Sequence, residues 1–160
     1  MVNPTVIYDI FKTPLGELYL IFSGTVLTGI SFVRPSGTAY KRGSAPKAFL
    51  KELESYFQGE NDCFNQEVVF LTGTAFEKSV WMTLKEIPFG ETRSYKWVAE
   101  HIGNPAAVRA VGQALSKNPI PIVIPCHRVI ESDGSIGGYA GGVNTKVRLL
   151  EMEYYAKMNK

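Results

Sequence analysis

The stretch that most restricts how this chain can fold is NPIPIVIPCHR, residues 118–128. Three of its residues are prolines: Pro119, Pro121 and Pro125. Proline fixes its own φ and lacks an N–H donor, so this stretch can be neither a helix nor a central strand. We therefore predict a stiff, extended segment that holds the next residue, Cys126, at a fixed place. His127 and Arg128 follow directly, and a glycine-rich segment, GGYAGG at 137–142, comes soon after.

Length and composition describe an ordinary folded protein. Hydrophobic residues make up 45% of the 160 residues, enough for one compact unit or two small ones. No run approaches the roughly 18 apolar residues of a membrane span, and the start, MVNPTVIYDIF, lacks the pattern of a signal peptide. Two cysteines do not suggest a disulfide scaffold, and the cysteines and histidines show no metal-ligand spacing. We expect a cytoplasmic protein with no metal, no cofactor and no membrane partner.

Charge is distributed unevenly along the chain, although the formal net charge is only +2. Residues 1–72 hold six Lys/Arg and seven Asp/Glu, a net of −1, whereas residues 73–160 hold eleven and eight, a net of +3. Residues 101–130 contain no acid, and their basic residues are Arg109, Lys117 and Arg128. A basic surface of this kind suits a polyanion such as a nucleic-acid backbone. A solvated face that happens to lack acids explains the pattern equally well.

The first part of the chain has the pattern of a small sheet with one packed helix. Three short runs rich in β-branched and aromatic residues predict a β-meander: TVIYDIF, ELYLIF and VLTGISF. Residues 34–46 read as a loop. Apolar residues then recur at helical spacing over 46–59, which predicts a helix that ends at Gly59. QEVVFL, at 66–71, is a candidate for one more strand.

The second part is mainly helical. Thr74 and Glu77 form a capping-box pair that starts a first helix, and Ser94 caps a second, YKWVAEHI. Asn104 and Pro105 start a third helix, AAVRAVGQALSK. Two short helices joined by a tight turn that contains glycine are typical of a helix-turn-helix unit. RVIESDGSIGGY then predicts a hairpin that serves as a wing.

The third helix has an apolar face and a face of small and polar residues. Val108, Val111 and Leu115 are expected to face the core. The outward face combines polar residues with small ones: Arg109, Gln113, Ser116, Ala106 and Ala110. Small side chains let a helix approach a partner closely, as a DNA groove requires. Helix propensity and packing against a neighbouring helix explain the alanines as well.

Cys126 is the candidate nucleophile. A free cysteine is more often a small buried hydrophobe, and a nucleophilic one needs a base or a positive field to form its thiolate. His127 and Arg128 are suitable groups, but neighbours in an extended chain point to opposite sides. A water is therefore the expected bridge between Cys126 and His127. Cys63 lies in ENDCFNQ, with no His or Arg nearby, and we interpret it as structural or incidental.

IPCHRVI, the preceding SYKWVAEHIGNPAAVRAVGQALSKNP and the following GGYAGG closely resemble the O6-alkylguanine-DNA alkyltransferase family. The similarity runs from about Phe76 to Glu153, and the first lobe is similar only loosely, through TPLGELYL. The resemblance implies an α/β (α+β) fold: a ribonuclease-H-like lobe over 1–72 and a helical, winged helix-turn-helix domain over 73–160. It implies single, irreversible transfer of an alkyl group from guanine O6 in double-stranded DNA to the cysteine, by a monomer.

The resemblance also implies residue roles. Cys126 is the alkyl acceptor, His127 deprotonates it through a water, and Glu153 orients the imidazole. Tyr95 protonates the departing guanine, and Asn118 ties the active-site turn together. DNA contacts are expected from Arg109, which replaces the flipped nucleotide in the stack, and from Ala106, Ala110, Gln113, Ser116, Lys117 and Arg128. The guanine pocket is expected to contain Val129, Gly137, Gly138, Tyr139 and Ala140.

Two departures from the family pattern affect these expectations. Many members carry a hydroxyl residue where this chain has Ala140, which leaves backbone amides or Tyr95 to stabilise the leaving group. Some relatives bind zinc in the first lobe, but this chain lacks the Cys and His for it. Two rival functions are the alternatives. Lesion-binding, non-catalytic alkyltransferase-like proteins typically have Trp in place of Cys126, and a winged-helix transcription factor does not need Cys-His beside a glycine-rich loop.

Overall fold

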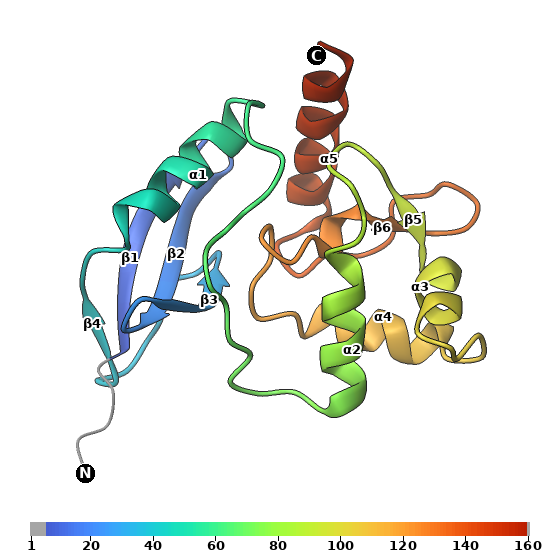
Figure 1. The fold of residues 1–160 in the computed structure, drawn as a ribbon, viewed down its shortest axis with the longest axis horizontal. Coiled ribbons are helices and arrows are strands. Elements are labelled where there is room, and N and C mark those ends of the chain that lie inside the picture. The colour runs from blue at the N-terminus through green and yellow to red at the C-terminus, as the bar shows by residue number, and fades with distance from the viewer. Residues whose placement is uncertain (1–5, 160) are drawn as a thin grey trace. The chain divides into compact units, whose positions relative to one another are not determined.

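The computed structural model describes residues 6–159. The chain divides after Leu71 into two compact units, Met1–Leu71 and Thr72–Lys160, one residue before the boundary expected from the sequence. The first unit is a sheet with one helix, and the second is mainly helical (Figure 1). This agrees with the mixed α/β fold expected from the sequence. Within the described residues, no helix is long and apolar enough to cross a membrane.

The sheet of the first unit is a meander with one added strand. β1 (Val6–Thr13) pairs antiparallel with β2 (Gly16–Ser23), and β2 pairs antiparallel with β3 (Val26–Ser31). This confirms the predicted meander. β4 (Tyr40–Arg42) pairs in parallel with β1, so the strand order is β3-β2-β1-β4. The prediction of a loop across 34–46 is therefore wrong at this strand. Three residues are too few to show a strand pattern, and β4 depends on pairing with a strand far away in the sequence.

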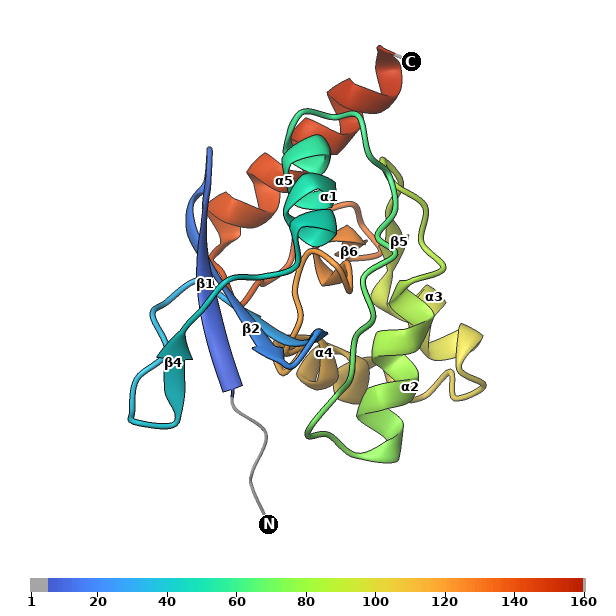
Figure 2. The ribbon, with the colours of Figure 1, turned by 60° about the vertical axis from the view of Figure 1, so that its left-hand side comes forward.

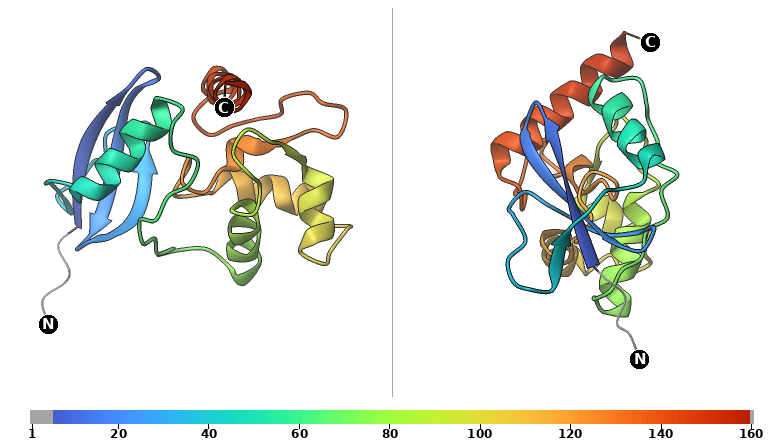
Figure 3. Two further views of the ribbon diagram at one scale, coloured as in Figure 1. Left: turned by 45° about the horizontal axis from the view of Figure 1, so that its top comes forward. Right: turned by 90° about the vertical axis from the view of Figure 1, so that its left-hand side faces the viewer.

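Helix α1 (Lys47–Phe57) lies against one face of this sheet (Figures 2 and 3). Its predicted apolar stripe is buried, with Phe49, Leu53 and Tyr56 at 0% exposure. Phe49 also contacts Phe22 of β2 edge-on, at a ring separation of 5.7 Å. The candidate strand at 66–71 forms only an isolated bridge to β3, in which Leu27 donates to the Glu67 carbonyl at 2.9 Å.

Two of the three helices predicted for the second unit begin with the predicted side-chain caps. Thr74 accepts the Glu77 amide at 3.1 Å at the start of α2 (Ala75–Leu84), and Glu77 accepts the Thr74 amide at 2.9 Å. Ser94 caps α3 (Tyr95–His101). α4 (Val108–Ser116) begins later than Asn104 and Pro105 predicted, because residues 104–107 form a separate turn. Val108 is consequently at the helix start and 39% exposed, so its expected core position is wrong.

The last part of the second unit differs most from expectation. A 16-residue helix, α5 (Val143–Met158), was not predicted. The expected hairpin is also wrong: the chain turns, with Glu131 donating to the Ser135 carbonyl at 2.9 Å, but no strand returns along β6 (Val129–Ile130). β6 pairs in parallel with β5 (Arg93–Ser94) instead. Gly137, at a φ of 75°, directs the chain away from an extended course.

Candidate active site

Cys126, His127 and Arg128 form one turn of 3-10 helix, not the extended segment that was expected. A 3-10 helix has about three residues per turn, so three consecutive side chains point in three directions. All three side chains are buried: Cys126 is 7% exposed, His127 0% and Arg128 6%. The turn therefore fixes three reactive or charged groups inside the second unit.

The segment before this turn is braced by Asn118. The Asn118 side chain accepts the Ile120 amide at 3.0 Å and donates to the Ile124 carbonyl at 2.8 Å. Between these residues Ile122 has a φ of 76°, a conformation that a β-branched residue rarely adopts. Asn118 also acts to lower the pKa of the Cys126 thiol, against the larger effect of burial. One amide side chain thus braces the strained turn that leads to Cys126.

Glu153 of α5 joins His127 and Arg128 in a buried charge network. His127 Nε2 lies 2.6 Å from Glu153 Oε2, and Arg128 donates to both carboxylate oxygens, from Nε at 2.8 Å and from Nη2 at 3.1 Å. Arg128 also donates to the Ile87 carbonyl at 2.8 Å. The expectation that Arg128 contacts DNA is therefore wrong. A buried carboxylate needs a buried cation, and Arg128 fills that need.

The protonation of this network follows from its burial and its partners. Burial alone raises the pKa of Glu153, but His127 and Arg128 outweigh it and hold this pKa well below its usual range. Burial lowers the pKa of His127, against the attraction of Glu153. We assign a neutral imidazole whose Nε2–H donates to Glu153. Nδ1 is buried and has no hydrogen-bond partner within residues 6–159, so it is the basic nitrogen.

The Cys126 thiol is protonated near neutral pH. Burial raises the pKa of Cys126 to about 11, while the hydrogen bond from Asn118 and the charge of Lys146 act in the opposite direction. Reaction at this sulfur therefore needs a base close by. His127 is the next residue along the chain, and its free Nδ1 can accept a proton.

Cys126 lies in the wall of a pocket of about 740 Å³ within the second unit. The pocket brings together seven of the residues predicted for the site: Tyr95, Arg109, Ser116, Cys126, Gly138, Tyr139 and Ala140. Burial raises the pKa of Tyr95, and the nearby Glu131 and Cys126 raise it further, so its phenol remains a proton donor. Burial likewise raises the pKa of Tyr139 well above its usual value.

Val129 and Gly137 were also predicted for the pocket, but they are not among the residues that line its wall. Val129 is 0% exposed. At Gly137 a side chain is excluded, because a Cβ there would lie 2.8 Å from the Tyr95 hydroxyl. Asn118, His127 and Glu153 do not line the pocket and belong to the networks described above. Gly137 thus lets the loop backbone approach Tyr95 closely, whereas a Cβ at Gly138 would meet no atom within 4 Å.

The predicted DNA-contact residues other than Arg128 lie on or near the surface around α4. Ala110 is partly buried, and the exposed ones are Ala106, Arg109, Gln113, Ser116 and Lys117. Lys117 lies 3.5 Å from Glu77, so part of its charge is already balanced. The small side chains of this face lie on the same helix as Arg109 and Ser116, which line the pocket.

Two functional candidates were missed by sequence reasoning. Lys146 of α5 is 0% exposed and donates to the carbonyls of Val129, at 2.6 Å, and Gly138, at 3.2 Å. It therefore ties β6 to the glycine-rich loop and places a positive charge near Cys126. Glu131 lines the pocket. Neither belongs to a motif, and a charged residue on a helix is usually read as solvated. Within residues 6–159, no group of three or more His, Cys, Asp or Glu side chains could hold a metal ion.

Comparisons with known proteins give one consistent result. Residues 75–155 match the family model described as "6-O-methylguanine DNA methyltransferase, DNA binding domain", and residues 6–70 match its "ribonuclease-like domain". The chain is similar to the methylated-DNA–protein-cysteine methyltransferase of Mycobacterium leprae, with 46% identity over 146 residues and 88% of each chain covered. The protein of that name from Methanosarcina barkeri is 44% identical over 156 residues, covering 91% of this chain and 96% of that one.

A solved structure is similar over nearly the whole chain. The crystal structure of Mycobacterium tuberculosis OGT in complex with DNA has a TM-score of 0.89 and 42% identity, with 94% of each chain covered. The structure of the Mycobacterium tuberculosis O6-methylguanine methyltransferase gives a TM-score of 0.88 at the same identity and coverage. The similarity includes both units of the chain.

Proposed function

The chain belongs to the 6-O-methylguanine DNA methyltransferase family, and from this premise we propose that it repairs DNA by direct alkyl transfer. Each molecule moves one alkyl group from O6 of guanine to the sulfur of Cys126 and then stops. The observation that carries the proposal is the placement of Cys126 in the wall of a pocket of about 740 Å³, followed directly in the chain by His127, which is paired with Glu153.

The proton of the thiol leaves before or during attack. His127 Nδ1 accepts it through a bridging water, and the negative Glu153 stabilises the imidazolium that forms. Arg128 keeps Glu153 ionised, so the carboxylate orients the ring without taking the proton itself. The raised pKa of Cys126 explains why this base is needed.

The transfer is a displacement at the alkyl carbon. A carbon–sulfur bond forms to Cys126 as the carbon–O6 bond breaks, and the electron pair of that bond leaves with guanine. Tyr95 is the donor that protonates the departing base. A thioether has no bond that water readily cleaves, so Cys126 is not regenerated. The turn braced by Asn118 holds the sulfur in line with the carbon–oxygen bond.

Because Ala140 has no hydroxyl group, other groups must stabilise O6 of the departing guanine. With no hydroxyl at 140, the backbone amides of the glycine-rich loop and the phenol of Tyr95 remain to interact with it. Lys146 supports this arrangement because it fixes the Gly138 carbonyl and leaves the loop in one position. Val129, Gly137 and Tyr139 complete the pocket for guanine.

The partner is double-stranded DNA that contains O6-alkylguanine, bound by the protein as a monomer in the cytoplasm. The small-residue face of α4, with Ala106, Ala110, Gln113, Ser116 and Lys117, approaches the minor groove. Arg109 occupies the place of the flipped nucleotide while guanine enters the pocket. The DNA-bound structure of the similar mycobacterial protein supports this choice of partner. A purely lesion-binding protein is not favoured, because it has no use for the thiol.

Stoichiometry tests the proposal. The protein is incubated with a duplex that contains O6-methylguanine, and the modified peptide is mapped by mass spectrometry. We expect one methyl group per molecule, on Cys126 and not on Cys63, and no further turnover when more duplex is added. Cys63→Ser is the matched control and should react like the wild type. Repeated turnover, or methylation that persists in Cys126→Ser, contradicts the assignment.

The role of Arg109 has its own test. Single-turnover rates are measured for Arg109→Ala and His127→Ala with the duplex and with the free base O6-benzylguanine. Extruding a paired base costs a few kcal/mol, so Arg109→Ala should slow the duplex reaction by about tenfold or more and change the free-base reaction little. His127→Ala should slow both. Equal slowing of both substrates by Arg109→Ala contradicts the finger role.

A further inference from the structure

The carboxylate of Glu153 accepts a hydrogen bond from outside the Cys126–Arg128 turn. His127 and Arg128 supply three of its hydrogen bonds, one to Oε1 and two to Oε2. The backbone N–H of Gly90 supplies a fourth, to Oε1 at 3.2 Å. A carboxylate has about four lone-pair sites, so these four donors match its capacity. Gly90 is therefore in direct contact with the group that orients the His127 imidazole.

Gly90 belongs to the short segment that follows α2, and this segment contacts the buried charge network at three points. The Ile87 carbonyl accepts a hydrogen bond from Arg128 Nη1 at 2.8 Å. The Arg128 guanidinium also lies over the Phe89 ring, 5.7 Å from its centre. Gly90 then donates to Glu153. The segment therefore holds both members of the Arg128–Glu153 ion pair.

Position 90 accommodates glycine and no larger residue without a rearrangement of the chain. Its φ is 80°, in the left-handed region that favours glycine. A Cβ there would lie 2.7 Å from Lys157 Cδ, 3.0 Å from Lys157 Cβ and 3.3 Å from the Glu153 carbonyl oxygen. A side chain at this position would push the segment away from α5. The hydrogen bond from Gly90 to the Glu153 carboxylate would then lengthen or break.

We propose that Gly90 is a positioning residue for the alkyl transfer, because its N–H fixes the Glu153 carboxylate that orients His127. This inference rests on the proposed function and adds to it a group outside the turn that carries Cys126. The donor is a backbone N–H, so its place depends on the course of the segment that follows α2. The reactivity of Cys126 then depends on a segment outside the wall of its pocket.

The N–H of Gly90 also affects the pH at which His127 is neutral. Burial lowers the pKa of His127, against the attraction of Glu153. The charges of Arg128 and Lys146 lower this pKa as well. A donor to a carboxylate stabilises its negative charge and weakens its attraction for a neighbouring cation. Without that donor, Glu153 attracts the imidazolium more strongly, so His127 stays protonated to a higher pH and cannot accept the proton of the thiol.

The test compares Gly90→Ala with a matched control, Gly134→Ala. Gly134 also lies in the second unit and has a positive φ, 89°, but a Cβ there would meet no atom within 4 Å. Both variants carry similar backbone strain, and only Gly90→Ala displaces a donor to Glu153. Single-turnover rates are measured between about pH 6 and pH 8.5 on a duplex that contains O6-methylguanine. The protein is in saturating excess, which removes differences in DNA binding, and circular dichroism at each pH checks that the variants are folded.

Gly90→Ala should be slowed most at the acid end of this range. A hydrogen bond to a charged group predicts that the ratio of the wild-type rate to the Gly90→Ala rate grows by about tenfold from the basic to the acid end. Gly134→Ala should keep the wild-type profile. A backbone ester at position 90, introduced as glycolic acid by cell-free translation, deletes only the N–H and should give the same trend without a Cβ.

The pH profile separates this role from a merely structural one, which lowers the rate by the same factor at every pH. A constant ratio therefore overturns the inference, as does a wild-type profile for the ester or an equal trend in Gly134→Ala. If Gly90→Ala does not fold, the ester decides the outcome. Failure of the wild type to react with the duplex contradicts the proposed function itself.

Discussion

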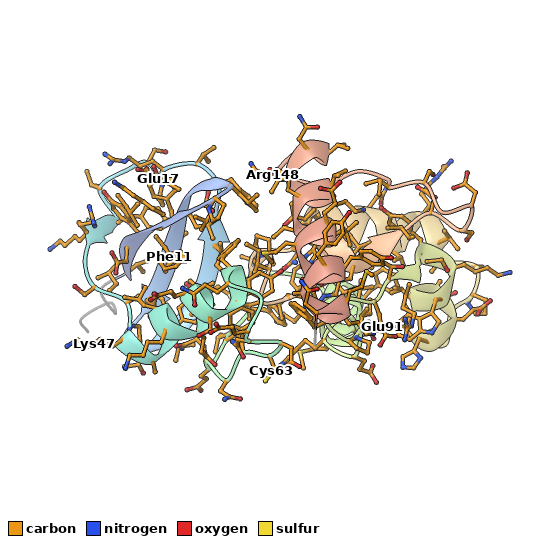
Figure 4. All side chains as sticks on the ribbon, turned by 90° about the horizontal axis from the view of Figure 1, so that it is seen from above. Phe11, Glu17, Lys47, Cys63, Glu91 and Arg148 are labelled. Atoms are coloured by element: carbon orange, nitrogen blue, oxygen red, sulfur yellow. The ribbon has the colours of Figure 1, made fainter. Side chains whose placement is uncertain are left out.

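The two units of the molecule bury different kinds of side chain. In the first unit the buried residues are apolar or aromatic apart from Thr28, and they include Phe22, Phe49 and Tyr56. Figure 4 labels Phe11 of β1, whose ring stacks on Phe57 of α1 at 6.3 Å. The second unit also has an apolar core, but among the described residues it buries four His, Arg, Lys or Glu side chains as well: His127, Arg128, Lys146 and Glu153.

This difference separates stability from chemistry. Apolar burial stabilises a fold by about 25 cal/mol for each Å² removed from water, without any requirement for exact partners. A buried charge destabilises the fold by several kcal/mol unless a partner and hydrogen bonds compensate it. The stability of the second unit around Cys126 therefore depends on the pairing of buried charges, whereas that of the first unit does not.

Glu153→Gln should break the buried network of the second unit. It removes the charge that balances Arg128 and replaces one of the two carboxylate oxygens, both of which accept hydrogen bonds, with an NH2 donor. Breaking a buried ion pair typically costs about 3–5 kcal/mol, and we expect a fall of that size in the free energy of unfolding of this unit. Urea unfolding followed by hydrogen exchange, resolved for each unit, measures it. An unchanged free energy of unfolding of the second unit would contradict this expectation and would mean that Arg128 finds other partners.

The two cysteines should differ by roughly a hundredfold in reaction with iodoacetamide. Cys63, in the first unit, is exposed (Figure 4), whereas Cys126 is buried and has its pKa raised to about 11. The thiolate is the reactive form of cysteine, so only a small fraction of the Cys126 thiol can react at pH 7.5. Peptide mass spectrometry over time gives both rates, and unfolding in urea is the control that should make them similar. Faster labelling of Cys126 in the folded protein contradicts the protonated thiol.

Acid should destabilise the second unit before the first. The folded-state pKa of Glu153 lies below its unfolded value, so the stability it contributes is complete above about pH 5 and is lost as pH falls through the folded pKa. The folded-state pKa of His127 is also lowered, so protons bind the unfolded chain more tightly below about pH 6.5. Both effects have the same sign, so together they lower the stability of the second unit as pH falls. Hydrogen exchange between pH 7 and about pH 3 measures them, and equal losses in both units refute the contrast.

Thr74→Ala should have the smallest effect. It removes the hydroxyl that accepts the Glu77 amide at the start of α2 and costs about 1 kcal/mol. No charge is left unpaired in the interior, so the loss should not depend on the network around Glu153. A double variant with Glu153→Gln should give additive losses, and strong coupling between the two sites contradicts independent roles.

Local patterns predicted much of this structure. The meander and α1 follow from strand and helix periodicity, and the caps at Thr74 and Ser94 follow from short-range side-chain chemistry. Features that depend on distant partners were lost. Helix α5 was not predicted because two of its three buried residues, Lys146 and Glu153, are charged, so the sequence shows no apolar face there. Arg128 was assigned to DNA because its acidic partner lies 25 residues away in the sequence.

The site shows the same division. Cys126 and His127 could be singled out from the residues themselves, but the role of Glu153 could be proposed only through a family resemblance, since nothing in its spacing brings α5 to the turn. Lys146 could not be assigned from the sequence, because the Val129 and Gly138 carbonyls that it binds are brought to it only by the fold.

The 3-10 turn at Cys126–Arg128 has a consequence for how this chain can evolve. Because successive side chains there differ in direction by about 120°, inserting or deleting one residue would rotate every later group by a third of a turn. The imidazole would then point where the thiol should be, and the guanidinium would leave its carboxylate. Loops elsewhere can change length, but this tripeptide cannot do so without displacing its thiol, imidazole or guanidinium group. Its length should therefore be inherited unchanged while its surroundings diversify.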